Sequence, residues 1–270
     1  MTSSFIQREQ RPYTVTGLTK GMPSLDEIQT LLLNWQADES PSDFAERVRT
    51  EGILTKQTAR RTKDLVSQLF RPWFLQPDDR AARWLKALVE VGGDRRALNE
   101  LVFLYKARSE AVLYDFTLKQ FWPACHDGEL YLRTGDIERF LQDAQEDGRT
   151  TKRLSTQTEA RLAQGIFTAL TEVGFLSEEH RYAREYVSYR MSGFSVAYLA
   201  YDLHFANLPD GILVEHPDWG LFGLSREHTL DRLDTLDERA GLIVQRAGSV
   251  VSITWLHTAM DEVIDAYTRQ

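Results

Sequence analysis

The segment RRALNELVFLYKARSEAVLYDFTLKQF, residues 95–121, carries the longest clean helical periodicity in the chain. Apolar side chains recur along it at intervals of three or four residues, which places them on one face of an α-helix. These side chains are Leu98, Leu101, Val102, Tyr105, Val112, Leu113 and Phe116. The segment therefore predicts a long helix at the centre of a mainly α-helical protein.

Shorter helical patterns surround this segment on both sides. Most open on a Ser or Thr that can cap the first turn, and several end at a Gly or Pro that stops a helix. The expected N-caps are Ser24, Ser42, Thr55 and Thr134, and the expected stops are Gly52, Pro72, Gly174 and Gly241. We expect these helices over residues 24–36, 42–52, 55–70, 78–93, 134–148, 155–174, 194–206, 225–241 and 256–267.

Two stretches have the alternation typical of β-strands. YAREYVSYRM, residues 182–191, predicts a strand. LIVQRAGSVVSITW, residues 242–255, predicts a hairpin about a turn at 246–249, where Gly248 can adopt positive φ. The fold class is therefore mainly α, a helical bundle with helix-turn-helix or winged-helix-like units and one or two short β-hairpins.

The composition along the chain suggests four parts. Residues 1–23 are polar and interrupted by Pro and Gly, which predicts an extended N-terminal arm. Residues 24–144 form a helical domain with a helix-turn-helix at 43–70. The polar stretch 145–156 is expected to be a linker, and 157–270 a winged-helix-like α+β domain.

The bulk properties exclude several classes of protein. The 270 residues are 11% aromatic, which excludes a mainly disordered chain, and the single Cys125 excludes a disulfide framework. We find no secretory signal and no apolar run that could cross a membrane, so we expect a cytoplasmic protein without membrane contact. The sequence also lacks phosphate-loop, dinucleotide, nucleophile-elbow and zinc-protease motifs, and its histidines are dispersed, so we expect no catalytic residue, metal or cofactor.

One basic segment stands out in a chain whose net charge is −8, namely EGILTKQTARRTKDLVSQLF at residues 51–70. A helix, a turn at Gly52 and a second helix from about residue 56 have the order of a helix-turn-helix, whose second helix enters the major groove. Residues 41–75 hold seven basic and four acidic residues, so this part of the chain is locally positive. The candidate DNA contacts are Lys56, Gln57, Arg60, Arg61 and Lys63. The alternative is a solvated helix face.

A second candidate combines the helix at 155–174 with the strand that follows it, as in a winged helix. Its basic residues could follow a phosphate backbone. They are Lys152, Arg153, Arg161, Arg181, Arg184 and Arg190. A third helix and hairpin, at 225–256, has the same outline, but its carboxylates would repel DNA and favour a structural or protein-docking role.

Three segments resemble the BrxA family of bacterial BREX (bacteriophage exclusion) systems. They are VTGLTKGMPSLDEIQTLLLNW (15–35), LSTQTEARLAQGIFTALTEVGFL (154–176) and the stretch 195–255, which begins SVAYLAYDLHF. The resemblance covers most of residues 13–265 and rests on segment order. It implies a non-enzymatic, cytosolic, nucleic-acid-associated defence protein that works beside a methyltransferase and other BREX proteins. The family has also been compared with NusB, an RNA-binding helical bundle. The acidity of the last third departs from this pattern and limits any DNA face to the remainder.

These observations lead to a functional hypothesis with two alternatives. We expect a non-enzymatic component of a phage-defence system that binds double-stranded DNA through the helix-turn-helix and the adjacent basic residues. The alternatives are a protein-interaction adaptor of the defence complex and a NusB-like RNA-binding protein. The salt dependence of binding distinguishes nucleic-acid binding from the adaptor alternative. Phosphate contacts weaken steeply as the salt concentration rises, whereas contacts at an apolar docking surface do not.

Overall fold

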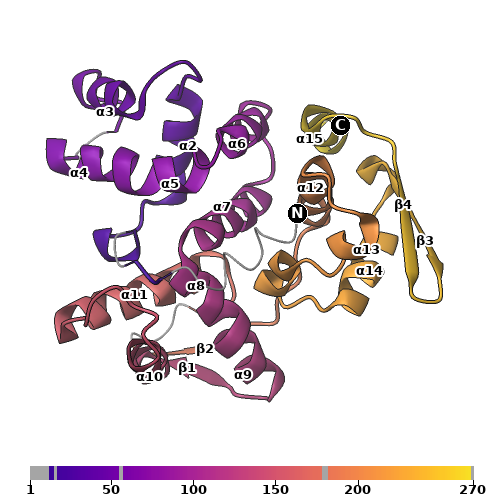
Figure 1. Cartoon of the computed structure of the whole chain (residues 1–270). Helices are drawn as coiled ribbons and strands as arrows, with labels where there is room; N and C mark the ends of the chain where they lie inside the picture. The colour runs from indigo at the N-terminus through magenta and orange to yellow at the C-terminus, as the bar shows by residue number, and fades with distance from the viewer. Residues whose placement is uncertain (1–11, 15–16, 55–56, 178–181, 269–270) are drawn as a thin grey trace.

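The computed structural model describes residues 12–14, 17–54, 57–177 and 182–268. Most of these residues are helical (Figure 1). The α-helices are α2 (Leu25–Asn34), α3 (Pro41–Thr50), α4 (Ala59–Asp64), α5 (Arg71–Phe74), α6 (Arg80–Glu90), α7 (Arg95–Ser109), α8 (Ala111–Phe116), α9 (Trp122–His126), α10 (Thr134–Glu146), α11 (Thr156–Glu172), α12 (Gly193–Phe205), α13 (Asp210–Leu213), α14 (Arg226–Asp234) and α15 (Met260–Thr268). Short 3-10 turns are η1 (Leu18–Lys20), η4 (Pro217–Phe222) and η5 (Glu238–Ala240), and π-helical segments are η2 (Leu65–Phe70) and η3 (Thr117–Phe121). The strands are β1 (Tyr131–Arg133), β2 (Ala183–Glu185), β3 (Leu242–Ala247) and β4 (Val250–Trp255).

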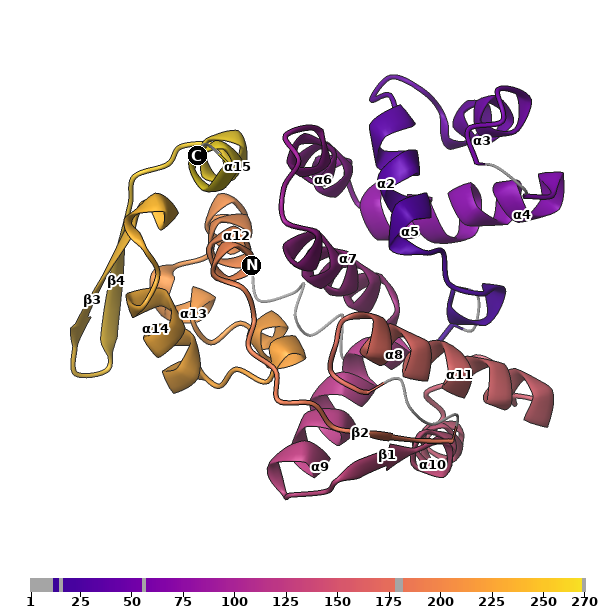
Figure 2. The same cartoon turned by 180° about the vertical axis from the view of Figure 1, so that it is seen from behind.

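Helix α7 lies at the centre of the molecule. Figures 1 and 2 show α2 to α6 on one side of it, α12 to α15 on another, and α10 and α11 beside α8. Its Leu98, Leu101 and Leu104 are buried, and so are its charged Glu100 and Lys106. A helix buried on nearly all sides is a core element, which confirms the central helix predicted from the sequence.

The single helix predicted over residues 95–121 is interrupted at Glu110. This residue has φ −100° and ψ 90°, which is extended rather than helical, so α7 ends at Ser109 and α8 begins at Ala111. The Glu110 side chain is buried, and Trp73 Nε1 donates to its Oε1 at 3.3 Å. A contact with a distant residue therefore accompanies a break that the apolar periodicity does not show.

Each π-helical segment is followed by a proline inside a continuing helix. Pro72 lies in the first turn of α5 after η2, and Pro123 lies in the first turn of α9 after η3. A proline ring in a regular α-helix clashes with the carbonyl one turn earlier, and the wider π turn relieves that clash. The helix therefore continues through Pro72 to Phe74 and ends close to the predicted position.

The helix caps agree with the sequence in part. Ser24 caps α2, as predicted, and forms a capping box with Glu27. The cap of α3 is Ser40 rather than Ser42, because Pro41 occupies the first helical position. The following helix is capped by Thr58 and starts at Ala59, whereas the predicted cap Thr55 lies outside the described residues. Thr134, which was also predicted to be an N-cap, is instead the first residue of α10.

Two small antiparallel sheets complete the fold. Strands β3 and β4 form the predicted hairpin, with Gly248 at φ 62° in the turn. The predicted helix before this hairpin is shorter than expected, since α14 ends at Asp234. Strand β2 is also shorter than the predicted 182–191, and its partner is β1, which precedes α10 and α11 in the chain. This pairing is therefore not a local hairpin, although the mainly α fold class with short β elements is confirmed.

The described residues of the predicted arm and linker pack against the rest of the protein. Tyr13 is buried, its backbone N–H donates to the Arg149 carbonyl at 2.7 Å, and its hydroxyl donates to Asp115 at 2.8 Å. Residues 147–155 connect α10 to α11, and the Gln145 side chain accepts from the Leu154 N–H at 2.7 Å. The predicted linker thus forms the loop between two packed helices, while the division into domains stays a prediction.

Candidate nucleic-acid interface

The first candidate surface is formed by α3, the segment 51–58 and the helix that begins at Ala59. The connection spans eight residues between helix bounds at Thr50 and Ala59, longer than the three or four of a typical helix-turn-helix. Gly52 in this connection has φ 64°, as the predicted turn requires. The helix-turn-helix interpretation of residues 43–70 therefore stays a prediction, with a longer turn than expected.

The basic residues predicted on this surface have different surroundings. Arg60 and Lys63 are exposed on α4, and neither side chain has a hydrogen-bond or ion-pair partner within the described part of the chain. Arg61 instead donates to the carbonyls of Lys20 at 2.7 Å and Gly21 at 3.0 Å. Gln57 donates to Glu27 at 2.7 Å, and Lys56 lies outside the described residues. Arg60 and Lys63 are thus exposed to solvent, whereas Arg61 holds η1 against α4.

The second candidate surface is built on α11. Strand β1 leads into α10, the chain continues through α11, and β2 then returns to pair with β1 in antiparallel register. Residues just after α11 lie against β2 as well, because Leu176 forms an antiparallel bridge with Tyr186 and Ser177 N–H donates to the Glu185 carbonyl at 2.9 Å. The helices α10 and α11 and the small sheet therefore form one packed unit (Figure 2).

One face of α11 is apolar and buried, and the opposite face is polar. The buried face includes Leu162, Ile166 and Leu170. The opposite face carries Gln157, Arg161, Gln164 and Thr168, which recur every three or four residues. The first three are exposed, and Thr168 is half-buried and accepts from Gln164 Nε2 at 3.2 Å. This stripe contains no carboxylate, although the chain as a whole is acidic.

The other predicted residues of this surface divide into four groups. Lys152 and Arg153 are exposed just before the N-terminus of α11. Arg184 donates to Thr171, and its guanidinium lies over the Phe167 ring at 4.8 Å from the centroid, so it packs against α11. Arg190 is exposed and lines a cavity with residues of α7, α12 and α14, and Arg181 lies outside the described residues.

A short segment joins the two surfaces. The Leu18 carbonyl oxygen of η1 lies 2.4 Å from the position that a Cβ on Gly165 of α11 would occupy. On its other side, η1 is held to α4 by Arg61 and by an ion pair of 3.2 Å between Lys20 and Asp64. No local sequence pattern indicates this contact, because it joins residues far apart in the chain.

Three side chains of the α11 stripe are not among the candidate DNA contacts predicted from the sequence. They are Gln157, Gln164 and Thr168. Because these residues are uncharged, they do not belong to the pattern of basic residues. Their helical spacing with Arg161 was a visible signal. Their spacing alone does not show whether another element of the fold covers this polar face.

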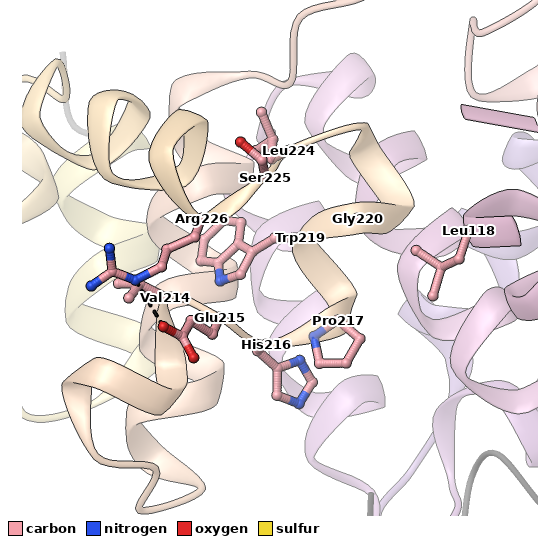
Figure 3. Close-up of a pocket in the computed structure, with 10 residues that line it drawn as sticks. All are labelled: Leu118, Val214, Glu215, His216, Pro217, Trp219, Gly220, Leu224, Ser225 and Arg226. Carbon is pink, nitrogen blue, oxygen red and sulfur yellow. Dashed lines mark ion pairs between the residues drawn. The ribbon is translucent and has the colours of Figure 1, made fainter. Parts of the chain in front are cut away.

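A cavity of about 270 Å³ lies between η3 and the segment around η4 (Figure 3). Trp219, His216 and Leu118 line it, and its charged residues Glu215 and Arg226 form an ion pair at 2.8 Å. His216 is buried, and its Nδ1 accepts from the Asp218 backbone N–H at 3.2 Å. The charged groups of this cavity therefore compensate each other.

Buried titratable groups elsewhere hold helices together. Burial raises the pKa of Glu110 to about 7, against the smaller lowering effects of the Trp73 hydrogen bond and Lys106. Burial also lowers the pKa of Lys106, which pairs with Glu172 at 3.1 Å and joins α7 to α11.

Among the described residues no group of three or more His, Cys, Asp or Glu side chains has a metal-binding arrangement. In the same residues, no helix combines the length and the apolar character needed to cross a membrane.

Comparison with known proteins gives the family. The family model of BrxA matches residues 11–200. The chain belongs to the BrxA family. BrxA proteins are components of BREX phage-defence systems, and the matched region includes both candidate surfaces. It ends within α12, so the acidic α14 and the β3–β4 hairpin lie beyond it.

Comparison with structures supports the fold. The crystal structure of an uncharacterized protein from Magnetospirillum magneticum superposes with a TM-score of 0.58 at 17% identity. The similarity covers 72% of this BrxA chain and 95% of that chain, and at this identity it shows a shared fold. A comparison with curated proteins gives no match.

Proposed function

We propose that this BrxA protein binds double-stranded DNA through the unit β1–α10–α11–β2, which we interpret as a winged helix. In this interpretation α11 is the recognition helix and the antiparallel strands β1 and β2 belong to the wing. The observation that carries the proposal is the exposed stripe of Gln157, Arg161, Gln164 and Thr168 on α11. Arg recognises guanine edges, Gln recognises adenine and Thr contacts either, so these are side chains that suit base contacts in the major groove.

The surroundings of the stripe favour a phosphate backbone. Lys152 and Arg153 lie just before the N-terminus of α11, where the helix dipole also attracts anions. Arg60 and Lys63 on α4 are connected to α11 through η1 and would contact phosphates further along the duplex. The net charge of −8 does not oppose this arrangement, because exposed charges are screened beyond roughly 10 Å at 0.1 M salt.

The shape of α11 favours duplex DNA over duplex RNA. The major groove of B-form DNA admits an α-helix, whereas that of A-form RNA is deep and narrow. We therefore place the NusB-like RNA-binding alternative second. The adaptor alternative predicts binding to other BREX proteins, such as the methyltransferase, without a polar stripe on α11. We further propose that the protein is not an enzyme and acts in the cytoplasm, where phage DNA enters.

The test is a duplex-binding titration by fluorescence anisotropy at several salt concentrations. Arg161→Ala and Gln164→Ala should each weaken binding by roughly 1–3 kcal/mol if they contact bases. The double variant Arg60→Ala/Lys63→Ala should instead lower the salt dependence by about one unit per lost phosphate contact. Single-stranded DNA and duplex RNA serve as competitors.

A matched control is Arg83→Ala on α6. Arg83 is exposed and pairs with Asp79, and α6 lies well away from α11 in Figures 1 and 2. Its replacement should leave duplex affinity unchanged. If folded Arg161→Ala and Gln164→Ala variants bind duplex as tightly as the wild type does, the proposal is wrong.

A further inference from the structure

A second cavity, of about 350 Å³, lies where α7, α12 and α14 meet. Its lining includes Arg96, Arg190 and Arg232, the first residues of α12 at Ser192 and Gly193, and Asp237. The three arginines come from three separate parts of the chain. Three guanidinium groups around one cavity are unusual in a protein whose net charge is −8.

The carboxylates near this cavity already have partners. Glu100 is buried and accepts from Tyr189 Oη at 2.8 Å, from Ser192 Oγ at 2.6 Å and from Arg96 Nε at 3.2 Å. Asp237 accepts from Arg239 Nη2 at 2.6 Å. Arg96 and Arg239 are thus neutralised by Glu100 and Asp237.

Arg190 and Arg232 lack such compensation. Arg190 is exposed, and in the described part of the chain neither of these two guanidinium groups has a carboxylate within ion-pair distance. Arg232 Nη2 donates to the Met191 carbonyl at 2.5 Å, but its Nε is buried without a hydrogen-bond partner among the described residues. Burial, and then the like charge of Arg190, lower the pKa of Arg232. Two positive charges therefore lie close together, and one of them has an unused donor.

The backbone at the cavity adds to this positive potential. Ser192 caps α12, its hydroxyl accepting from the Ser195 N–H at 3.2 Å and its own N–H donating to the Glu100 carboxylate at 3.1 Å, and the positive end of this thirteen-residue helix lines the cavity. Gly193, the first helical residue, also lines the cavity.

We propose that the cavity between Arg96, Arg190 and Arg232 binds a phosphate group. Guanidinium forks and helix N-termini both recognise tetrahedral oxoanions, and a bound phosphate would compensate the two excess charges. The volume is at the small end of ligand pockets, which are roughly 300–1,000 Å³. The phosphate belongs either to a phosphorylated small molecule or to a DNA backbone. The site does not rest on duplex binding by α11, because it shares no residue with the α11 stripe.

The experiment is isothermal titration of the full chain with inorganic phosphate and with pyrophosphate, at constant ionic strength in chloride. We expect saturable binding that Arg190→Gln weakens roughly tenfold to a hundredfold, the effect of losing a hydrogen bond to a charged group. Arg190 is exposed, so this variant should fold. Arg232→Gln removes the contact with Met191 as well, so its melting temperature is measured alongside. Arg83→Gln, an exposed ion-paired arginine on α6, is the matched control and should bind phosphate as the wild type does.

A second arm identifies the source of the phosphate. If a saturating DNA duplex abolishes pyrophosphate binding, the phosphate belongs to the DNA backbone. If pyrophosphate binding persists with duplex bound, or if no duplex binds at all, the site serves a phosphorylated small molecule. The proposal is overturned if neither anion binds the wild-type protein, or if both bind equally well to folded Arg190→Gln and Arg232→Gln variants.

Discussion

Gly165 lies in the middle of α11, where the main chain of η1 approaches most closely. A Cβ at this position would lie 2.4 Å from the Leu18 carbonyl oxygen, and a backbone atom cannot move aside as a flexible side chain can. Glycine inside a helix normally costs about 0.5–1 kcal/mol relative to alanine. The close contact with η1 gives a physical reason for its presence.

We therefore predict that Gly165→Ala destabilises the protein although alanine favours helices. The expected loss in free energy of unfolding is roughly 1–3 kcal/mol, typical of an overpacked contact. Gly135→Ala in α10 is the matched control, since no atom lies within 4 Å of its Cβ position, and it should be neutral or slightly stabilising. Urea denaturation of both variants measures the difference. Equal stability of the two variants would contradict the close packing of η1 on α11.

Glu110 should make stability depend on pH. Its folded pKa of about 7 lies above its ordinary value of 4.5, so between these pH values the folded protein holds a proton that the unfolded chain has lost. Its contribution is fully present below about pH 4.5 and is lost as the pH rises through about 7. The contribution of Glu110 to the free energy of unfolding amounts to about 3 kcal/mol at most.

Glu110→Gln keeps a neutral side chain that can accept from Trp73 and removes the titration. Denaturation at pH 5 and at pH 8 measures the free energy of unfolding. It should decrease less between these two pH values for Glu110→Gln than for the wild type. If both proteins lose the same stability over this interval, Glu110 does not titrate there.

At the scale of elements, α11 and the small sheet act as a unit in which neighbouring arginines have different roles. Arg161 is exposed on the polar stripe. Arg184 of β2 instead lies over the Phe167 ring and donates to Thr171, both on α11. The same residue type is therefore exposed to solvent in one case and packed against α11 in the other.

We predict that Arg184→Ala lowers the free energy of unfolding by about 1–2 kcal/mol, through loss of the cation–π contact and the hydrogen bond. Arg161→Ala should change it by less than about 0.5 kcal/mol, as is usual for exposed residues. Chemical denaturation of the two single variants makes the comparison. An Arg184→Ala protein of wild-type stability and weakened duplex binding would instead identify Arg184 as a DNA contact.

At the scale of the whole molecule, a buried ion network joins the central helix to the C-terminal part. Arg108 of α7 pairs with Asp202 of α12 at 2.6 Å and with Asp218 of η4 at 2.7 Å. Tyr114 also donates to Asp218 at 2.8 Å. Burial by itself would lower the pKa of Arg108, but the two carboxylates outweigh it and hold the pKa well above its ordinary value. Because Asp202 and Asp218 lie beyond residue 200, this network couples the region matched by the BrxA family to the rest of the chain.

Replacing Arg108 by Met should leave two buried carboxylates without their cation. The expected cost is about 3–5 kcal/mol, as for other broken buried ion pairs. Arg83→Met, which removes an exposed ion pair with Asp79, should cost less than about 1 kcal/mol. Thermal and urea denaturation measure the stability of both variants. A loss below about 1 kcal/mol for Arg108→Met would show that the network does not hold the two parts together.

The sequence by itself determined the features that depend on neighbouring residues. The periodicity around Leu101, the capping box at Ser24 and the turn at Gly248 each arise from hydrogen bonds or side-chain positions within a few residues, so they can be read locally. The order of such segments along the chain also carried the resemblance to BrxA. The acidic C-terminal third was visible in the same way.

Only the tertiary structure decided which of these features act together. It pairs β1 with β2 across two helices, engages Arg61 with the carbonyl of Lys20, and brings Arg190 and Arg232 to one cavity. The physical reason is that the exposed face of a helix, and the partner of a long cationic side chain, depend on residues far away in the chain. Local patterns specify the elements, whereas the packing of those elements specifies which charges remain free to bind.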